Sequence, residues 1–196
     1  MSLTVALKHD GVIYIGSDSL ACRGGVKSYL TNKNSYRIFH VKGCDNMLMS
    51  LDGRLLEHNI ARCSYLVPEI NAIRGDIDFE FMVNEFVPNL FGIFGDRNVL
   101  TKIDGQIHCN SDMIVAYSDK LFTIFTDGAV IEYDDFTAIG EGVEEALGSL
   151  VTTRHFENPI ERVLCALRAG LRSKTRVAYP LVISNTATCE FETFDQ

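Results

Sequence analysis

The sequence lacks three features that mark large classes of protein. No hydrophobic run approaches the roughly 18–20 residues that a membrane-spanning helix needs, and the first residues do not show the basic-then-apolar pattern of a secretion signal. Positive charge is not in excess, because 18 Lys and Arg stand against 26 Asp and Glu and give a net charge of −8. A chain of this charge has no electrostatic footprint for nucleic acid or for anionic membranes. We therefore expect a cytoplasmic protein whose partners are neither nucleic acid nor membrane.

The cysteines and histidines lack the spacing of metal and redox sites. Six cysteines and five histidines are scattered along the chain, with no C-x-x-C and no H-E-x-x-H motif among them. Disulfide frameworks are typical of shorter, secreted chains. We expect reduced and mostly buried thiols, and neither a metal nor a cofactor.

What the sequence does contain is the composition of a folded globular protein. Of its 196 residues, 46% are hydrophobic and 22% are charged, which is enough to bury a core. No repeat, low-complexity segment or linker divides the chain, so residues 1–196 are predicted to form a single domain.

The first half of the chain predicts four strands followed by two helices. Apolar and β-branched runs between turn signals favour strands at 3–8, 12–15, 36–41 and 47–51, with a polar loop from Arg23 to Asn34. A second helix is expected from Asp78, a suitable N-cap, and Pro88 is expected to kink or end it. The first helix follows Gly53, and its apolar positions at helical spacing are Leu55, Leu56, Ile60, Cys63, Leu66 and Val67.

The second half repeats this order. Strands are expected between residues 98 and 133, including 113–117 and 121–125, and again at 136–140. Helices follow at 143–155 and 159–174, the latter opened by Asn158-Pro159, and strands at 179–183 and 189–194 close the chain. This order predicts two mainly antiparallel sheets with a pair of helices on each outer face.

Three short pieces of the sequence occur in a particular order. The first joins TVALK at 4–8 to GVIYIGSDSLA at 11–21, the second is LMSLDGRLLE at 48–57, and the third is FTAIGEG at 136–142. With the order of elements, these pieces resemble the proteasome-like N-terminal nucleophile hydrolases, and are similar to proteasome β subunits and the bacterial ATP-dependent ring peptidase. The resemblance covers nearly the whole chain and implies an α+β fold, a four-layer α-β-β-α sandwich.

The resemblance also implies a catalytic centre at the start of the chain. In this family the first residue of the mature protein is the nucleophile, and its own α-amine takes the proton from its hydroxyl group. An α-amine, with a pKa of about 7.7–8.0, is a suitable base near neutral pH. Counting back from Asp18, the family's acid that orients the amine, leads to Ser2, which removal of Met1 exposes. If Met-Ser-Leu is a leader, Thr4 takes that place instead.

Two further roles follow from the same resemblance. The cation that lowers the pKa of the nucleophile falls at Asn34 by ungapped counting, with Lys33 beside it, or at Arg37 when the strand pattern is matched. An arginine there supplies charge but does not transfer a proton, and either residue can instead be a solvated loop charge. Gly53 offers a backbone N–H for the oxyanion at a helix N-terminus, or is a turn glycine that needs a positive φ.

Two positions depart from the family pattern. Relatives commonly have Gly-Ser-Gly before the third helix, where this chain has Glu141 between two glycines. Relatives have an aspartate in the loop after the fourth helix, where this chain has RSKTR at 172–176. Glu141 either replaces part of the usual network or pairs with Lys174 or Arg176.

The leading functional hypothesis is a proteasome-like peptidase or amidase that acts through Ser2 on a peptide or protein substrate. The resemblance implies a homo-oligomer, as a ring or a related assembly, with an ATP-dependent unfoldase as a partner. The alternatives are a non-catalytic subunit that keeps the fold for assembly, and a small-molecule amidohydrolase.

Overall fold

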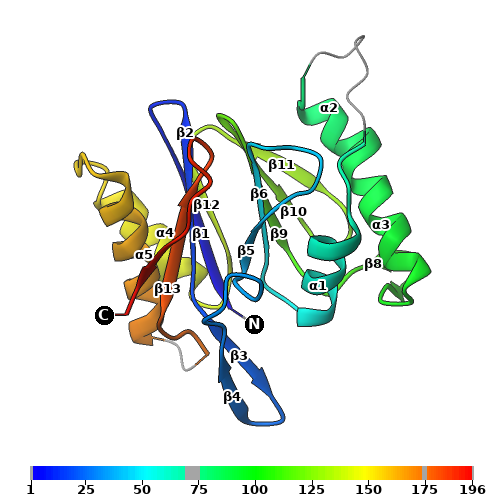
Figure 1. The fold of residues 1–196 in the computed structure, drawn as a ribbon, viewed down its shortest axis with the longest axis horizontal. Coiled ribbons are helices and arrows are strands. Elements are labelled where there is room, and N and C mark those ends of the chain that lie inside the picture. Colours follow the sequence, from blue (N-terminus) through cyan, green and yellow to red (C-terminus); the bar gives the residue numbers. More distant parts are fainter. Residues whose placement is uncertain (1, 69–75, 174–175, 196) are drawn as a thin grey trace.

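The computed structural model (Figure 1) describes residues 2–68, 76–173 and 176–195. Two five-stranded sheets face each other in the middle of the molecule, and helices cover both outer faces. The predicted four-layer α-β-β-α sandwich is therefore confirmed.

Every strand pairing among the described residues that lies within a sheet is antiparallel. The first sheet has the order β12 (Phe136–Gly140), β1 (Leu3–His9), β2 (Val12–Ser17), β13 (Leu181–Asn185) and β14 (Glu192–Phe194). The second has the order β11 (Val130–Tyr133), β10 (Lys120–Ile124), β9 (Met113–Tyr117), β6 (Met47–Leu51) and β5 (Ile38–His40).

The helices divide between the two outer faces as expected. Helices α4 (Val143–Thr152) and α5 (Pro159–Ser173) pack on the first sheet. Helix α1 (Leu55–Ser64) and the continuous helical stretch α2 (Phe79–Phe81), η1 (Met82–Phe86) and α3 (Val87–Asp96) pack on the second. A third cluster of buried residues, including Ile15, Leu48 and Ile114, fills the space between the sheets. No helix in the described part of the chain has the length and apolarity needed to cross a membrane.

The hairpin β1–β2 places the start of the chain in the first sheet. Its turn, Asp10-Gly11, has positive φ at both residues (48° and 75°), which is the geometry of a two-residue hairpin. The register pairs Thr4 with Ser17 and Leu3 with Gly140. The first residues of β1 therefore lie between the end of β2 and the end of β12.

The predicted polar loop after Arg23 is wrong, because a second hairpin occupies this segment. Strands β3 (Leu20–Arg23) and β4 (Val26–Tyr29) form a two-stranded ribbon that extends away from the sandwich (Figure 1). Gly24 and Gly25 both have positive φ and make its two-residue turn. Strands this short and exposed lack the alternating apolar pattern from which a strand is predicted.

Helix α1 is shorter than predicted and buries a different face. It ends at Ser64, because Val67 precedes Pro68 and is disfavoured in a helix. Leu66 instead forms an isolated parallel bridge with Lys42 and is 62% exposed. Leu55 and Leu56 were expected inside but are exposed, while α1 buries Glu57, His58, Ile60 and Ala61.

The helix from Asp78 begins as predicted but passes through Pro88. The Asp78 carboxylate accepts the N–H of Phe81 at 2.8 Å, which confirms the N-cap. The chain stays helical to Asp96, so Pro88 does not end the helix. The wider π-helical turn η1 lies just before it, where the ring of Pro88 would otherwise meet the carbonyl group of Asn84.

The remaining boundaries differ by a few residues. Asn158 accepts the N–H of Ile160 at 2.9 Å and caps α5 as predicted, whereas α4 ends at Thr152 rather than near 155. The last two strands begin two to three residues later than expected, at Leu181 and Glu192. Strands β7 (Thr101–Ile103) and β8 (Gln106–His108) form a short hairpin within the predicted β-rich region.

The cysteines are free, but the prediction that most are buried is wrong. Only Cys109 is buried, three others are half-buried, and Cys22 and Cys63 are exposed. The exposed pair lies on the β3–β4 hairpin and at the solvent-facing side of α1, the two places where the predicted pattern also failed.

Candidate active site

Asp18 anchors the first strand of the protein. Its carboxylate accepts the N–H of Leu3 at 2.9 Å through Oδ1, and those of Leu20 (2.9 Å) and Ala178 (3.2 Å) through Oδ2. Its own N–H donates to the carbonyl group of Leu3 at 3.2 Å. Asp18 therefore holds the peptide group that immediately follows Ser2.

The carboxyl group of Asp18 is fully buried, and this determines its protonation. Burial raises its pKa to about 6, against the opposing effects of the backbone N–H groups of Leu20 and Leu3 and the positive charge of Arg37. Asp18 is thus mostly ionised at neutral pH but takes up a proton in mildly acidic solution.

Ser2 immediately precedes β1 and is tightly packed. Its hydroxyl group donates to the carbonyl group of Asp52 at 3.3 Å, and its own carbonyl group accepts the N–H of Glu141 at 2.9 Å. Gly140 packs so closely that a Cβ there would lie 1.8 Å from the carbonyl oxygen of Ser2. Ser2 is buried, and Met1, whose removal the hypothesis requires, is outside the described residues.

Thr4 lies inside the sheet rather than at its entry. It is fully buried, is paired with Ser17 on one side and Ile139 on the other, and its hydroxyl group contacts that of Ser50 at 2.8 Å. As the chain stands, this is the environment of a core strand residue. The structure gives Ser2, not Thr4, the position beside Asp18.

Of the two candidate cations, the structure brings Arg37 to this site. Arg37 is 2% exposed, and its charge acts on both Asp18 and Asp52. Its Nη2 atom donates to the carbonyl group of Leu20 at 3.1 Å. Lys33 is exposed, its carbonyl group accepts from Arg62, and it lines a separate pocket with Asn34, His40 and Lys42.

Asp52 is a second carboxyl group that the sequence analysis did not assign to the site. Its Oδ1 atom accepts the N–H of Asp112 at 3.0 Å, and its backbone carbonyl group accepts from Ser2. Burial, together with repulsion from the Asp112 carboxylate, raises the pKa of Asp52 to about 6, although Arg37 lowers it. A carboxyl group that directly follows a buried strand was the available signal.

Position 53 requires glycine because the loop at Asn110 and Ser111 packs closely against its backbone. A Cβ at this position would lie 2.1 Å from the carbonyl oxygen of Asn110 and 2.3 Å from Oγ of Ser111. Its φ is not positive, so the alternative of a turn glycine that needs positive φ is wrong. Gly53 directly follows Asp52 and leads into α1, where backbone N–H groups are free of helical partners.

Glu57 holds the loop that packs against Gly53. Its fully buried carboxylate accepts the N–H of Asn110 at 3.1 Å, Nδ2 of Asn110 at 2.9 Å and the hydroxyl group of Ser111 at 2.5 Å. Because charge-assisted bonds of this kind are strong, Glu57 fixes the 110–111 loop against the glycine. The sequence does not reveal this role of Glu57, because an acidic side chain on the first turn of a helix is usually exposed to solvent.

The next residue of α1, His58, holds the backbone of Arg37. Its Nε2 atom lies 2.7 Å from the carbonyl oxygen of Arg37, and its ring packs edge-on against Phe39. Burial lowers the pKa of His58 to about 3, so the ring is neutral and donates this bond. One turn of α1 therefore positions both Gly53 and Arg37.

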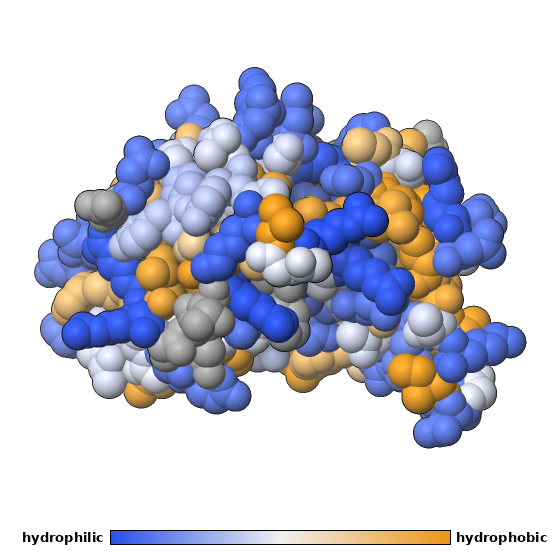
Figure 2. Space-filling view, turned by 90° about the horizontal axis from the view of Figure 1, so that it is seen from below, coloured by the Kyte–Doolittle hydropathy of each residue, from blue (hydrophilic) through white to orange (hydrophobic). Residues whose placement is uncertain are grey.

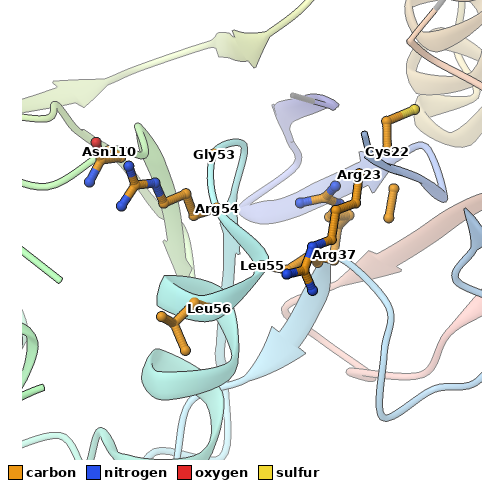
Figure 3. Close-up of a pocket in the computed structure, with 9 residues that line it drawn as sticks. Cys22, Arg23, Arg37, Gly53, Arg54, Leu55, Leu56 and Asn110 are labelled. Atoms are coloured by element: carbon orange, nitrogen blue, oxygen red, sulfur yellow. The ribbon is translucent and has the colours of Figure 1, made fainter. Parts of the chain in front are cut away.

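A pocket of about 880 Å³ opens beside Gly53 and Arg37 (Figure 3). It lies between the β3–β4 hairpin, the start of α1 and the loop at Asn110. Its lining residues are Ala21, Cys22, Arg23, Arg37, Gly53, Arg54, Leu55, Leu56 and Asn110. The exposed leucines of α1 that contradicted the predicted helix face are thus part of its wall.

Glu141, one of the two places where the sequence departs from the family pattern, lies next to Ser2. The backbone N–H of Glu141 binds Ser2, while its Oε2 atom is buried without a hydrogen-bond partner among the described residues. No ion pair to Arg176 is formed in that part of the chain, and Lys174 lies outside it. No group of three His, Cys, Asp or Glu residues is arranged to hold a metal within the residues described.

Comparisons with known proteins show which fold the chain has. No protein-family model matches the chain, and no curated protein matches it either. Two structures of BPH from Thiobacillus denitrificans, a bacterial proteasome homologue, do match. The complex with epoxomicin has a TM-score of 0.70 and 16% identity, over 99% of this chain and 100% of that one. The other has a TM-score of 0.71 and 19% identity, over 93% and 96%.

Anbu, the ancestral beta-subunit from Yersinia bercovieri, matches with a TM-score of 0.67 and 17% identity, over 99% of this chain and 87% of that one. All three likenesses extend over nearly the whole chain. The protein therefore has the fold of the proteasome-like N-terminal nucleophile hydrolases, as the three sequence pieces indicate.

Proposed function

We propose that the chain is a peptidase or amidase that cleaves amide bonds through Ser2. One observation supports this most directly: the peptide N–H that follows Ser2 is bound by the buried carboxylate of Asp18, and the Ser2 hydroxyl group lies against the Asp52-Gly53 turn. The Ser2 hydroxyl group is thus connected through Asp52 to the start of α1 at Gly53, which supports a nucleophile and an oxyanion donor that belong to one site.

The reaction follows from these positions. Removal of Met1 gives Ser2 a free α-amine, which takes the proton from the hydroxyl group as Oγ attacks the carbonyl carbon of the substrate. The N–H of Gly53 stabilises the negative charge that forms on the carbonyl oxygen. The amine then passes the proton to the leaving nitrogen, and a water molecule, activated by the same amine, hydrolyses the ester bond to Ser2.

Asp18 and Arg37 set the electrostatics of this step. The carboxylate orients the start of the chain, and the guanidinium favours the deprotonated nucleophile by proximity. Because Arg37 does not transfer a proton, the α-amine is the only base that the mechanism uses. No metal or cofactor takes part in it.

BPH is bound to epoxomicin, a proteasome inhibitor, which supports the proposal that this fold carries a site for a peptide substrate. In this chain the pocket beside Gly53 is the place for one side chain of such a substrate. The mechanism is further proposed to operate in the cytoplasm, in a homo-oligomeric ring or related assembly that receives protein substrates from an ATP-dependent unfoldase.

A second candidate is a non-catalytic subunit that keeps the fold for assembly. Arg37 in place of a proton-transferring lysine and Glu141 beside Ser2 favour it, since both alter the network around the nucleophile. This candidate predicts no hydrolysis, but a mass in solution that is a multiple of 21.9 kDa.

Hydrolysis of fluorogenic peptide amides by the protein with Ser2 as its first residue tests the proposal. We expect Ser2→Ala to lower kcat/KM at least about a thousandfold, because both the nucleophile and its attack geometry are lost. Ser2→Thr keeps a hydroxyl group and retains activity. Ser35→Ala, on an exposed loop, is the matched control, and equal rates for Ser2→Ala and Ser35→Ala would contradict the proposal.

A further inference from the structure

The pocket beside Gly53 has an unusual concentration of positive charge. Among the described residues that line it, three are arginines, Arg23, Arg37 and Arg54, and none is an aspartate or glutamate. They come from three different elements: the end of β3, the segment before β5, and the N-cap of α1. Such charge around one cavity raises the local concentration of anionic groups.

Arg37 at the base of this pocket has donors that nothing in the described chain satisfies. One nitrogen binds the carbonyl group of Leu20, but Nε and Nη1 are buried without a partner among the described residues. Asp18 and Asp52 act on it through charge alone, since neither forms an ion pair with it within 4 Å. Because buried N–H groups are nearly always hydrogen-bonded, these two donors favour a further acceptor close to Arg37.

The other two arginines line the pocket at its exposed side. Figure 3 shows Arg54 directed toward Asn110, on one side of Gly53, and Arg23 with Arg37 on the other. Neither Arg23 nor Arg54 takes part in an ion pair within the described residues. The end of the molecule to which the β3–β4 hairpin extends combines hydrophilic groups with several hydrophobic clusters (Figure 2).

The apolar part of the pocket lining limits which anionic groups can bind in the pocket. Ala21, Leu55 and Leu56 complete the lining, and they suit a short aliphatic chain that ends in an anionic group. A planar carboxylate matches guanidinium donors, which bind it with two parallel hydrogen bonds.

We propose that this pocket binds the carboxylate side chain, glutamate or aspartate, of the substrate residue on the acyl side of the cleaved amide bond. The inference rests on the proposed function, because it takes the Gly53 N–H as the oxyanion donor. Gly53 also lines the pocket, so the side chain that enters it belongs to the residue whose carbonyl group is attacked. Arg23 and Arg54 are then specificity-determining residues.

Peptide amides that differ at this one position test the preference. Glutamate and glutamine have the same shape and differ in charge, so their kcat/KM ratio isolates the carboxylate. We expect at least a roughly tenfold preference for glutamate over glutamine, which falls as salt is added. A ratio near one at low salt overturns the proposal.

Variants then assign the preference to the pocket. Arg23→Ala and Arg54→Ala lower the glutamate-to-glutamine ratio, and Arg54→Glu favours a lysine substrate over a glutamate one. Arg168→Ala, an exposed arginine on α5 outside the pocket, is the matched control and leaves the ratio unchanged. If neither Arg23→Ala nor Arg54→Ala changes the ratio more than Arg168→Ala does, the assignment to this pocket is wrong.

A binding measurement keeps this inference separate from the proposed chemistry. The Ser2→Ala protein is titrated calorimetrically with the glutamate and glutamine peptides, so no hydrolysis is needed. Tighter binding of the glutamate peptide supports the carboxylate site even if the wild-type protein hydrolyses nothing, in which case the peptidase mechanism alone fails. Equal binding of the two peptides contradicts the carboxylate site whether or not hydrolysis occurs.

Discussion

Two buried carboxyl groups and one buried guanidinium surround the start of β1. Burial raises the pKa of Asp18 and of Asp52 more than the charge of Arg37 lowers it, so the pKa of each is about 6. Such raised values are common where a protein needs a charge in a place that water does not reach. The site is therefore held charged at neutral pH at some cost to the stability of the fold.

This cost predicts a pH-dependent effect of Asp52→Asn. The folded protein binds the Asp52 proton more tightly than the unfolded chain does, with a pKa of about 6 against 3.8. The contribution of Asp52 to stability is thus full below pH 3.8 and is lost as the pH rises through 6. Relative to wild type, Asp52→Asn should gain roughly 2 kcal/mol in unfolding free energy between pH 4 and pH 7.5.

Urea unfolding of both proteins at the two pH values measures this gain. His58 has the opposite pH dependence: burial lowers its pKa to about 3, so its contribution to the unfolding free energy decreases as the pH falls. Both proteins contain His58, so this contribution cancels in the difference between their unfolding free energies. A difference in unfolding free energy that does not change with pH would show that Asp52 is not a destabilising buried charge.

The residues of the candidate site differ in how well a sequence can reveal them. Asp18 and Gly53 stand in short motifs, so their places beside Ser2 and at the start of α1 could be predicted. Glu57 and His58 could not, because their roles depend on which face of α1 is buried, and helical periodicity assigns that face to leucines. Asp52 directly follows a buried strand, and that position is a signal from which it could have been predicted. Counting residues could not decide between Lys33 and Arg37, because the β3–β4 hairpin, with its two-residue turn, lies between Asp18 and both of them.

At the scale of elements, glycines set how closely the helices approach the first sheet and each other. Gly142 is the N-cap of α4 with φ of 93°, and a Cβ there would lie 2.9 Å from Cα of Gly170 in α5. The contact brings the start of α4 against α5 directly after β12, the strand that pairs with Leu3. The glycine on this side of Glu141 therefore helps to place the segment that binds Ser2.

The same substitution at two glycines of this region should have opposite effects on stability. Gly142→Ala combines a left-handed residue with a backbone contact and is expected to lower the unfolding free energy by about 2 kcal/mol. Gly148→Ala, in the interior of α4 with open space around it, is expected to raise it by about 0.5–1 kcal/mol. Thermal unfolding of the two variants checks this, and a destabilised Gly148→Ala or a neutral Gly142→Ala would contradict the packing described.

Elements with a strong local signal were predicted well, and those shaped by distant contacts were not. The caps Asp78 and Asn158 and the Asp10-Gly11 turn use only neighbouring residues, so the sequence reveals them. In the β3–β4 hairpin only Leu20 and Ala21 are buried, and the exposed remainder of both strands has no core to give it a pattern. Pro88 is tolerated because the helix widens before it, which no local rule anticipates.

At the scale of the whole molecule, the layers were predictable because each apolar face needs a partner. The order of strands within the sheets was not, since β12 and β13 reach their partners across more than 100 residues. That order brings the ends of β2 and β12 to the start of β1 and so gathers Asp18, Gly140 and Ser2. The site is thus a product of the topology rather than of any one segment.

The central claim is that the α-amine of Ser2 is the base for its own hydroxyl group. The most direct test compares the rate of peptide-amide hydrolysis by the protein that begins at Ser2 with the rate by the same protein with Met1 retained, each form verified by intact mass. The account predicts hydrolysis by the first form and a loss of at least about a thousandfold in the second, because retention of Met1 turns the amine into an amide that takes up no proton. Equal rates in the two forms would contradict it.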